Sequence, residues 1–153
     1  MNSEISTEEL HKEFISKICQ TGKVWALEYN EEFASADSEE YEDEDGNPAE
    51  MICFWSEESK AQECINKEWK NYKIEVISLS EFIENWCIGM SNDQLLIGSD
   101  FTKQRIGHES DPLEVILEIN EECLLKKFNI KLENYSSLVT LAKEIRKVLI
   151  TEE

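Results

Sequence analysis

The chain has 153 residues, which is the length of one domain of ordinary size. It carries 34 acidic and 15 basic side chains, for a formal net charge of −19, and 41% of its residues are hydrophobic. The apolar content excludes a wholly disordered acidic chain, and the excess of acids argues against nucleic-acid binding, which needs Lys and Arg to replace counterions at phosphates.

The N-terminal segment predicts an amphipathic helix. Ser6 and Glu9 have the spacing of a capping box, and Gly22 supplies a stop signal. Apolar residues recur between them at a spacing of four and define one buried face: Leu10, Phe14 and Ile18. His11 follows directly on Leu10, so we expect it to face solvent or to lie at the edge of the helix.

Three strands are expected next. Segment 24–29 is rich in strand formers, and residues 32–37 are interpreted as its antiparallel return. The almost wholly apolar segment 51–55 is typical of a strand buried on both faces. Residues 38–49 indicate a turn or a mobile hairpin tip. A calcium loop aligned on Gly46 would lack acids at its first and last ligand positions, so a turn with this glycine in the left-handed conformation is favoured.

The second half of the chain alternates helices and strands. Ser56 is expected to cap a helix whose apolar stripe reaches Trp69, and Ser78 is expected to begin another helix, which ends at Gly89. Strands are expected at residues 73–77 and 95–98, and a loop at residues 102–110.

Two further helices should follow. Asp111 and Pro112 supply the N-cap and the first residue of a helix that reaches about Lys127, and the last helix should begin at Asn134 or Ser136. Both helices carry apolar stripes that need a partner surface. The order of elements predicts an α+β domain, with a small mixed or antiparallel sheet of about four strands packed by helices and a two-helix C-terminal extension.

We predict a division of the chain into two parts. Residues 1–108 would form the α+β domain, and residues 109–153 would form a helical extension packed on that domain or on a second copy, which would give a homodimer. The charge allows the C-terminal helices to lie against an acidic body in the same chain or in a second copy, because residues 123–153 carry six basic and four acidic side chains while residues 1–122 have a net charge of −21.

The acids are concentrated in one stretch. From Glu28 to Glu50 there are eleven acids and no Lys or Arg. Runs of like charge are most often solvated segments, but they also serve as interaction surfaces. The candidate surface consists of seven acids: Asp37, Glu39, Glu40, Glu42, Asp43, Glu44 and Asp45.

The residues that usually carry chemistry form no motif. The five cysteines are far apart and no CxxC pair exists, so free buried thiols in a reducing cytoplasm are expected. No apolar run approaches the roughly 20 residues of a membrane span, and the N-terminus lacks a signal-peptide pattern. We therefore assign no catalytic, cofactor-binding or metal-ligating residue. Arg105 and His108 are the polar groups of a possible ligand pocket in the loop after Gly98.

The four tryptophans and their neighbours also occur in a characteristic order. Core packing is the simplest role for the tryptophans, and an aromatic interface anchor is the alternative. The series between residues 8 and 100 is Val24-Trp25-Ala26-Leu27, Phe54-Trp55-Ser56, Ala61, Glu68-Trp69, Tyr72, Ile77-Ser78-Leu79, Glu81-Phe82, Trp86, Gly89-Met90 and Leu95-Leu96-Ile97-Gly98.

This succession resembles a bacterial family that is catalogued as domain-of-unknown-function family 2750. The resemblance implies a small cytoplasmic α+β domain with no established activity and no known catalytic residue to carry over. The acidic insert around residues 38–50 and the helices after Glu109 depart from the family pattern.

Three functions are compatible with the sequence. The leading hypothesis is a non-enzymatic interaction module whose acids meet a basic protein partner, for example an immunity-type inhibitor that blocks a basic toxin domain. The second is a small-ligand-binding or enzymatic domain with a pocket near Arg105 and His108. The third is a structural module that dimerises through the C-terminal helices. Neither a nucleic acid nor a membrane is expected as a partner.

Overall fold

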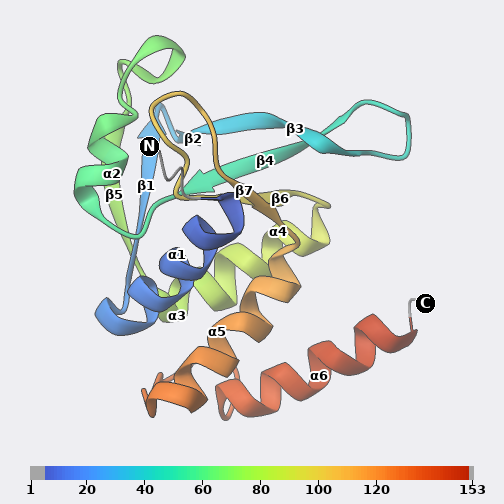
Figure 1. The fold of residues 1–153 in the computed structure, drawn as a ribbon. Coiled ribbons are helices and arrows are strands. Elements are labelled where there is room, and N and C mark those ends of the chain that lie inside the picture. Colours follow the sequence, from blue (N-terminus) through green and yellow to red (C-terminus); the bar gives the residue numbers. More distant parts are fainter. Residues whose placement is uncertain (1–5, 152–153) are drawn as a thin grey trace.

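The computed structural model describes residues 6–151 (Figure 1). The helical elements are α1 (Thr7–Thr21), α2 (Glu58–Glu63), the 3-10 helix η1 (Lys67–Trp69), α3 (Leu79–Glu81), the π-helical η2 (Phe82–Cys87), α4 (Ile88–Asn92), α5 (Pro112–Lys126) and α6 (Leu138–Thr151). The strands are β1 (Lys23–Tyr29), β2 (Glu32–Phe33), β3 (Ser35–Glu42), β4 (Pro48–Phe54), β5 (Lys73–Ser78), β6 (Leu96–Ser99) and β7 (His108–Ser110). The predicted α+β class is confirmed.

The strands form two sheets rather than one. The first has the order β2-β1-β5 and is antiparallel, and the second has the order β3-β4-β6-β7, in which only the β4–β6 pair is parallel. A bridge joins the sheets, because Trp25 and Trp55 exchange two backbone hydrogen bonds of 2.8 Å. The two sheets are therefore connected through this bridge.

The predicted return strand 32–37 is divided between these sheets. Only β2 pairs with β1, through a two-residue turn in which Asn30 and Glu31 both have positive φ, as the twist of a tight hairpin requires. Ala34 then donates to Leu27 O and accepts from Cys53 N. Ala34 therefore lies at the point where the chain leaves the first sheet and enters the second, in which β3 pairs with β4.

The hairpin of β3 and β4 extends away from the body of the protein (Figure 1). Its turn is held by Asp43, whose carboxylate accepts from the backbone N–H groups of Asp45 and Asn47 at 2.9 Å each. Gly46 has φ of 83°, so the predicted left-handed turn is confirmed. The turn predicted for residues 38–49 is shorter in the structure, because residues 38–42 belong to β3 and residues 48–49 belong to β4.

One helical segment crosses the core. The capping prediction for Ser78 is confirmed, since its hydroxyl accepts from Glu81 N at 3.2 Å. The predicted end at Gly89 is wrong, because α3, η2 and α4 run on to Asn92. Gly89 keeps helical geometry, and Phe82, Ile83 and Cys87 are fully buried against α1 and α5. Packing therefore outweighs the local preference of glycine for a helix end.

The prediction that Ser56 caps a helix is wrong. Helix α2 begins two residues later, and both the backbone N–H and the hydroxyl of Ser56 donate to the buried carboxylate of Asp100, at 2.8 Å to Oδ1 and Oδ2 respectively. Lys60 donates to the same carboxylate at 3.1 Å. The helix predicted to continue to Trp69 is interrupted after Glu63 and is followed by η1.

The tryptophans are mostly core residues. Trp55 and Trp69 are fully buried and meet edge to face at 6.0 Å, so the core-packing prediction is confirmed for this pair. Trp25 and Trp86 are half-buried and pack against the two apolar clusters. Trp86 forms edge-to-face contacts with Phe33 at 4.6 Å and Phe54 at 5.5 Å.

Both C-terminal helices contact the core. Helix α5 places Val115, Ile116 and Ile119, all fully buried, in the same apolar cluster as α1, and α6 adds Leu141 and Ile145 to that cluster. The predicted N-cap at Asp111 is confirmed by its 2.8 Å contact with Leu113 N. The division of the chain at residue 108 stays a prediction.

The packing of α5 can be tested with one pair of substitutions. We expect Ile116→Ala to lower the free energy of unfolding by about 2–5 kcal/mol, because it opens a cavity at a fully buried position. Leu125→Ala, on the same helix but 73% exposed, should change it by less than about 0.5 kcal/mol. Thermal and urea denaturation would measure both. Equal effects would contradict the orientation of this helix.

Candidate functional site

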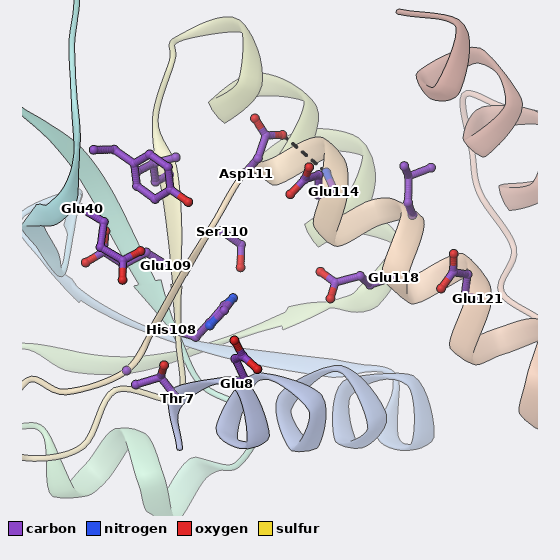
Figure 2. Close-up of a pocket in the computed structure, with 14 residues that line it drawn as sticks. Thr7, Glu8, Glu40, His108, Glu109, Ser110, Asp111, Glu114, Glu118 and Glu121 are labelled. Atoms are coloured by element: carbon purple, nitrogen blue, oxygen red, sulfur yellow. Dashed lines mark hydrogen bonds between the residues drawn. The ribbon is translucent and has the colours of Figure 1, made fainter. Parts of the chain in front are cut away.

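A cavity lies where α1, α5, β3 and β7 meet. It has a volume of about 780 Å³, within the range of small-ligand sites. Figure 2 shows it bounded on one side by the start of α1 and on the other by the first turns of α5. We call it the acidic cavity. Its lining residues include His108, Ser110, Leu117 and, from the hairpin, Tyr41.

Seven carboxylates line the acidic cavity, and its lining includes no Lys or Arg. They are Glu8, Glu40, Glu109, Asp111, Glu114, Glu118 and Glu121. Some of them have structural roles: Asp111 caps α5, and Glu109 accepts hydrogen bonds from Ser38 Oγ and, at 3.2 Å, from Glu39 N. With seven acids and no base, the lining carries an excess of negative charge.

Two helix N-termini explain how so many acids can gather here. Thr7 and Glu8 lie in the first turn of α1, while Asp111 and Glu114 lie at the start of α5. Unpaired amide groups give each helix N-terminus a partial positive charge, which favours nearby anions. The helix ends thereby offset part of the repulsion among the acids.

His11 is buried beside this cavity, so the expectation that it faces solvent or the helix edge is wrong. Only 3% of the residue is exposed. Its Nε2 lies 2.8 Å from Glu118 Oε1 and its Nδ1 lies 2.8 Å from Ser99 Oγ. A carboxylate only accepts, so Nε2 carries the proton, and the Ser99 hydroxyl can donate to or accept from Nδ1. Both ring nitrogens are satisfied in either protonation state.

His108 stacks on His11, with ring centroids 4.4 Å apart. It lies on β7, part of the segment predicted as loop, and pairs with Ser99 of β6 in the ladder. Burial, and then the charge of His11, hold the pKa of His108 below its usual value, while the carboxylates of Glu118, Glu40 and Glu8 act in the opposite direction. His108 is therefore a neutral ring at neutral pH that lines the cavity.

The Ser99–His11–Glu118 series has the residue types of a hydrolase triad but lacks an accessible nucleophile. Ser99 is fully buried, and neither Ser99 nor His11 lines the acidic cavity. A nucleophile must lie within reach of the substrate carbonyl. The series therefore acts as a structural hydrogen-bond chain that joins β6, α1 and α5.

The cysteines are equally unsuited to nucleophilic chemistry. All five are free and buried. Burial raises the pKa of Cys19, Cys53, Cys64, Cys87 and Cys123, which keeps them as neutral thiols, whereas a reactive cysteine needs a lowered pKa and access to solvent.

Metal binding finds no support in residues 6–151. Within that range, no group of three or more His, Cys, Asp or Glu side chains is close enough together to hold a metal ion. The same residues contain no helix with the length and apolar character needed to cross a bilayer.

The structure separates the two residues of the predicted pocket. His108 lines the acidic cavity, but Arg105 does not. The guanidinium of Arg105 lies 3.7 Å above the Trp69 ring and donates to Glu68 at 2.8 Å and to Asn66 O at 3.1 Å. Arg105 therefore holds the loop after β6 against η1.

The seven predicted surface acids all lie on the hairpin, and we call residues 37–45 the acidic arm. All seven are exposed, and only Glu40 also lines the acidic cavity. None of the ion pairs found in the described part of the chain involves the arm. Its base is fixed by Ser38, which donates to Glu109 and accepts from Tyr41 N at 2.8 Å. The adjoining acids of α5 could not be recognised from the sequence, because they come close to the arm only through folding.

Comparison with known families identifies a match. A family model described as "Protein of unknown function (DUF2750)" matches residues 11–119. The chain belongs to this family. The match includes His11, the acidic arm and the first half of α5, and therefore most of the cavity lining, but Thr7, Glu8 and Glu121 lie outside it. No curated protein and no solved structure matches the chain significantly.

The stacked histidine pair predicts a measurable pKa change. We expect the pKa of His108 to lie below the usual histidine value and to rise toward it in His11→Gln, which removes both the neighbouring charge and part of the burial. Because the folded state favours neutral His108, its contribution to stability is complete above about pH 6.5 and falls as the pH drops below it. NMR titration of the imidazole signals would measure this. An unchanged or lower pKa in His11→Gln, or an equal rise in Lys73→Gln, would contradict the stacked geometry.

Proposed function

We propose that the chain is a non-enzymatic interaction module that binds a basic protein partner through the acidic arm. The observation that carries this proposal is the arm itself, a projecting hairpin with seven exposed carboxylates outside the described ion pairs (Figure 1). Charge of one sign on an exposed arm accelerates encounter with a partner of opposite sign.

The arm is also ordered enough to present a defined surface. Ser38 ties its base to Glu109, and Asp43 closes its turn with two backbone contacts. An ordered segment loses less conformational entropy on binding than a mobile one. Tyr41, which is 49% exposed, supplies an aromatic side chain of the kind that anchors interfaces.

A concrete form of this proposal is an immunity-type inhibitor. A row of carboxylates resembles a phosphate backbone in charge, so the arm would occupy the phosphate-binding cleft of a basic toxin domain such as a nuclease. This form requires that both proteins meet in the cytoplasm, and the cytoplasmic location stays a prediction.

The arm is tested by removing charge without disturbing its hydrogen bonds. Asp37→Asn, Glu39→Gln, Glu42→Gln and Glu44→Gln, combined in one variant, leave Ser38, Asp43 and Glu109 in place. We expect this variant to lose capture of basic proteins from native cell extract and to lose most of the salt dependence of that capture, because exposed charges are screened beyond about 8–10 Å at physiological salt. Affinity capture at low and physiological salt would measure it.

The matched control removes four exposed acids elsewhere: Glu63→Gln, Glu75→Gln, Glu133→Gln and Glu144→Gln. This control should capture the same basic proteins as the unaltered chain. Equal capture by both variants, or equal loss in both, would mean that the arm is not the binding surface.

Self-association through the C-terminal helices is a second proposal, supported by apolar exposure. Leu124 and Leu125 near the end of α5 are 60% and 73% exposed, and Ile150 on α6 is 69% exposed. Contiguous exposed apolar side chains favour association, and Leu124 and Leu125 are adjacent in the sequence. A chain cut at Glu109 would lose core residues of α5, so it does not test this proposal.

Substitution of exposed residues on α5 tests the proposed dimer without removing residues of the hydrophobic core. We expect Leu124→Lys with Leu125→Lys to convert a dimer to a monomer with little change in the melting temperature. Light scattering over a range of concentrations would show it. A monomeric unaltered chain, or a dimer that survives both substitutions, would rule out this interface.

A further inference from the structure

We propose that the acidic cavity binds an extended organic cation that carries several separated ammonium or guanidinium groups. Both a linear polyamine and a short Lys- or Arg-rich segment have this chemistry. The inference goes beyond the role of the acidic arm, because it assigns a ligand to a cavity on the body of the domain.

The arrangement of the carboxylates favours an extended cation over a metal ion. They come from α1, β3, β7 and α5 and surround the space on several sides (Figure 2). Within residues 6–151 no three potential ligands are close enough together for one metal ion. Separated carboxylates instead match a ligand whose positive charges are themselves separated along a chain.

Ser110 provides an independent indication of a ligand. This residue is only 6% exposed, it lines the cavity, and its hydroxyl has no hydrogen-bond partner among the described residues. Figure 2 shows the hydroxyl directed toward the space between His108 and Glu118. A buried polar group without a partner costs free energy. An N–H group of a bound cation would satisfy the Ser110 oxygen.

The remaining lining suits the carbon chain of such a ligand. Leu96, Leu117 and the Tyr41 ring offer apolar contact to methylene groups between the charges. His108 does not repel a cation at neutral pH, because burial holds its pKa low. A volume of about 780 Å³ has room for an extended chain rather than for one small ion.

The experiment uses the full chain with spermine as the polyamine and tetra-arginine as the peptide probe. We expect saturable binding by calorimetry, and amide NMR shifts concentrated at residues 107–111 and 117–121. Tighter binding of spermine identifies a free polyamine as the ligand, and tighter binding of tetra-arginine identifies a basic segment. Absence of binding by both probes overturns the inference.

Two variants locate the site. Glu114→Gln with Glu121→Gln should weaken binding of the better probe about tenfold, since both acids line the cavity and neither belongs to the acidic arm. Ser110→Ala should weaken it about fivefold. The control Glu63→Gln with Glu75→Gln removes the same charge outside the cavity and should leave binding within about twofold. An equal loss in this control would show that only net charge matters and would overturn the inference.

Magnesium chloride at matched ionic strength provides the last comparison. If Mg²⁺ shifts the same amides at the same concentration as the better probe, the preference for an extended cation is wrong. The arm variant with Asp37→Asn, Glu39→Gln, Glu42→Gln and Glu44→Gln keeps all seven cavity carboxylates, so it should still bind the better probe saturably even if capture of basic proteins is lost.

Discussion

The buried side chain of His11 determines how the elements around the acidic cavity meet. An imidazole loses its hydration on burial, which costs free energy unless both nitrogens find partners. Here Ser99 of β6 and Glu118 of α5 supply them, each at 2.8 Å. Because His108 pairs with Ser99 in the strand ladder, it is brought onto the His11 ring. One side chain therefore sets the spacing of α1, α5 and the β6–β7 pair.

The same arrangement explains why the negative charge is tolerated. An accumulation of carboxylates opposes folding through self-repulsion. In this fold, Glu8, Asp111 and Glu114 lie at the N-terminal ends of α1 and α5, where the helix dipoles favour anions. The arm places the other large group of acids on a projecting hairpin, where water screens them. The negative charge is thus divided between helix N-termini and an exposed hairpin, and both locations reduce the repulsion that opposes folding.

Helix caps, which depend on residues within one helical turn, could be predicted from the sequence. Contacts between segments that are distant in the sequence could not. Ser6, Gly22 and Asp111 serve the cap functions that their residue types indicate, because a cap depends only on nearby amides and carbonyls. Ser56 has the same local pattern, yet Asp100, 44 residues away, binds its amide and hydroxyl. For the same reason, the burial of His11 and the separation of Arg105 from His108 could not be predicted, since both depend on residues far away in the sequence. The acidic stretch was recognisable, but its proximity to the α5 acids depends on the fold.

The arm and the acidic cavity share one electrostatic field, since Glu40 belongs to both. A cation held in the cavity would lower the negative potential at the base of the arm and so weaken its attraction for a basic partner. By thermodynamic reciprocity, a basic partner on the arm would weaken cation binding by the same factor. This coupling requires no conformational change, because charge alone transmits it over distances near the screening length. A partner that instead inserted a basic side chain into the cavity would use both sites at once, and competition with the small cation would then be complete. The degree of competition between the two ligands therefore distinguishes two neighbouring sites from one continuous binding surface.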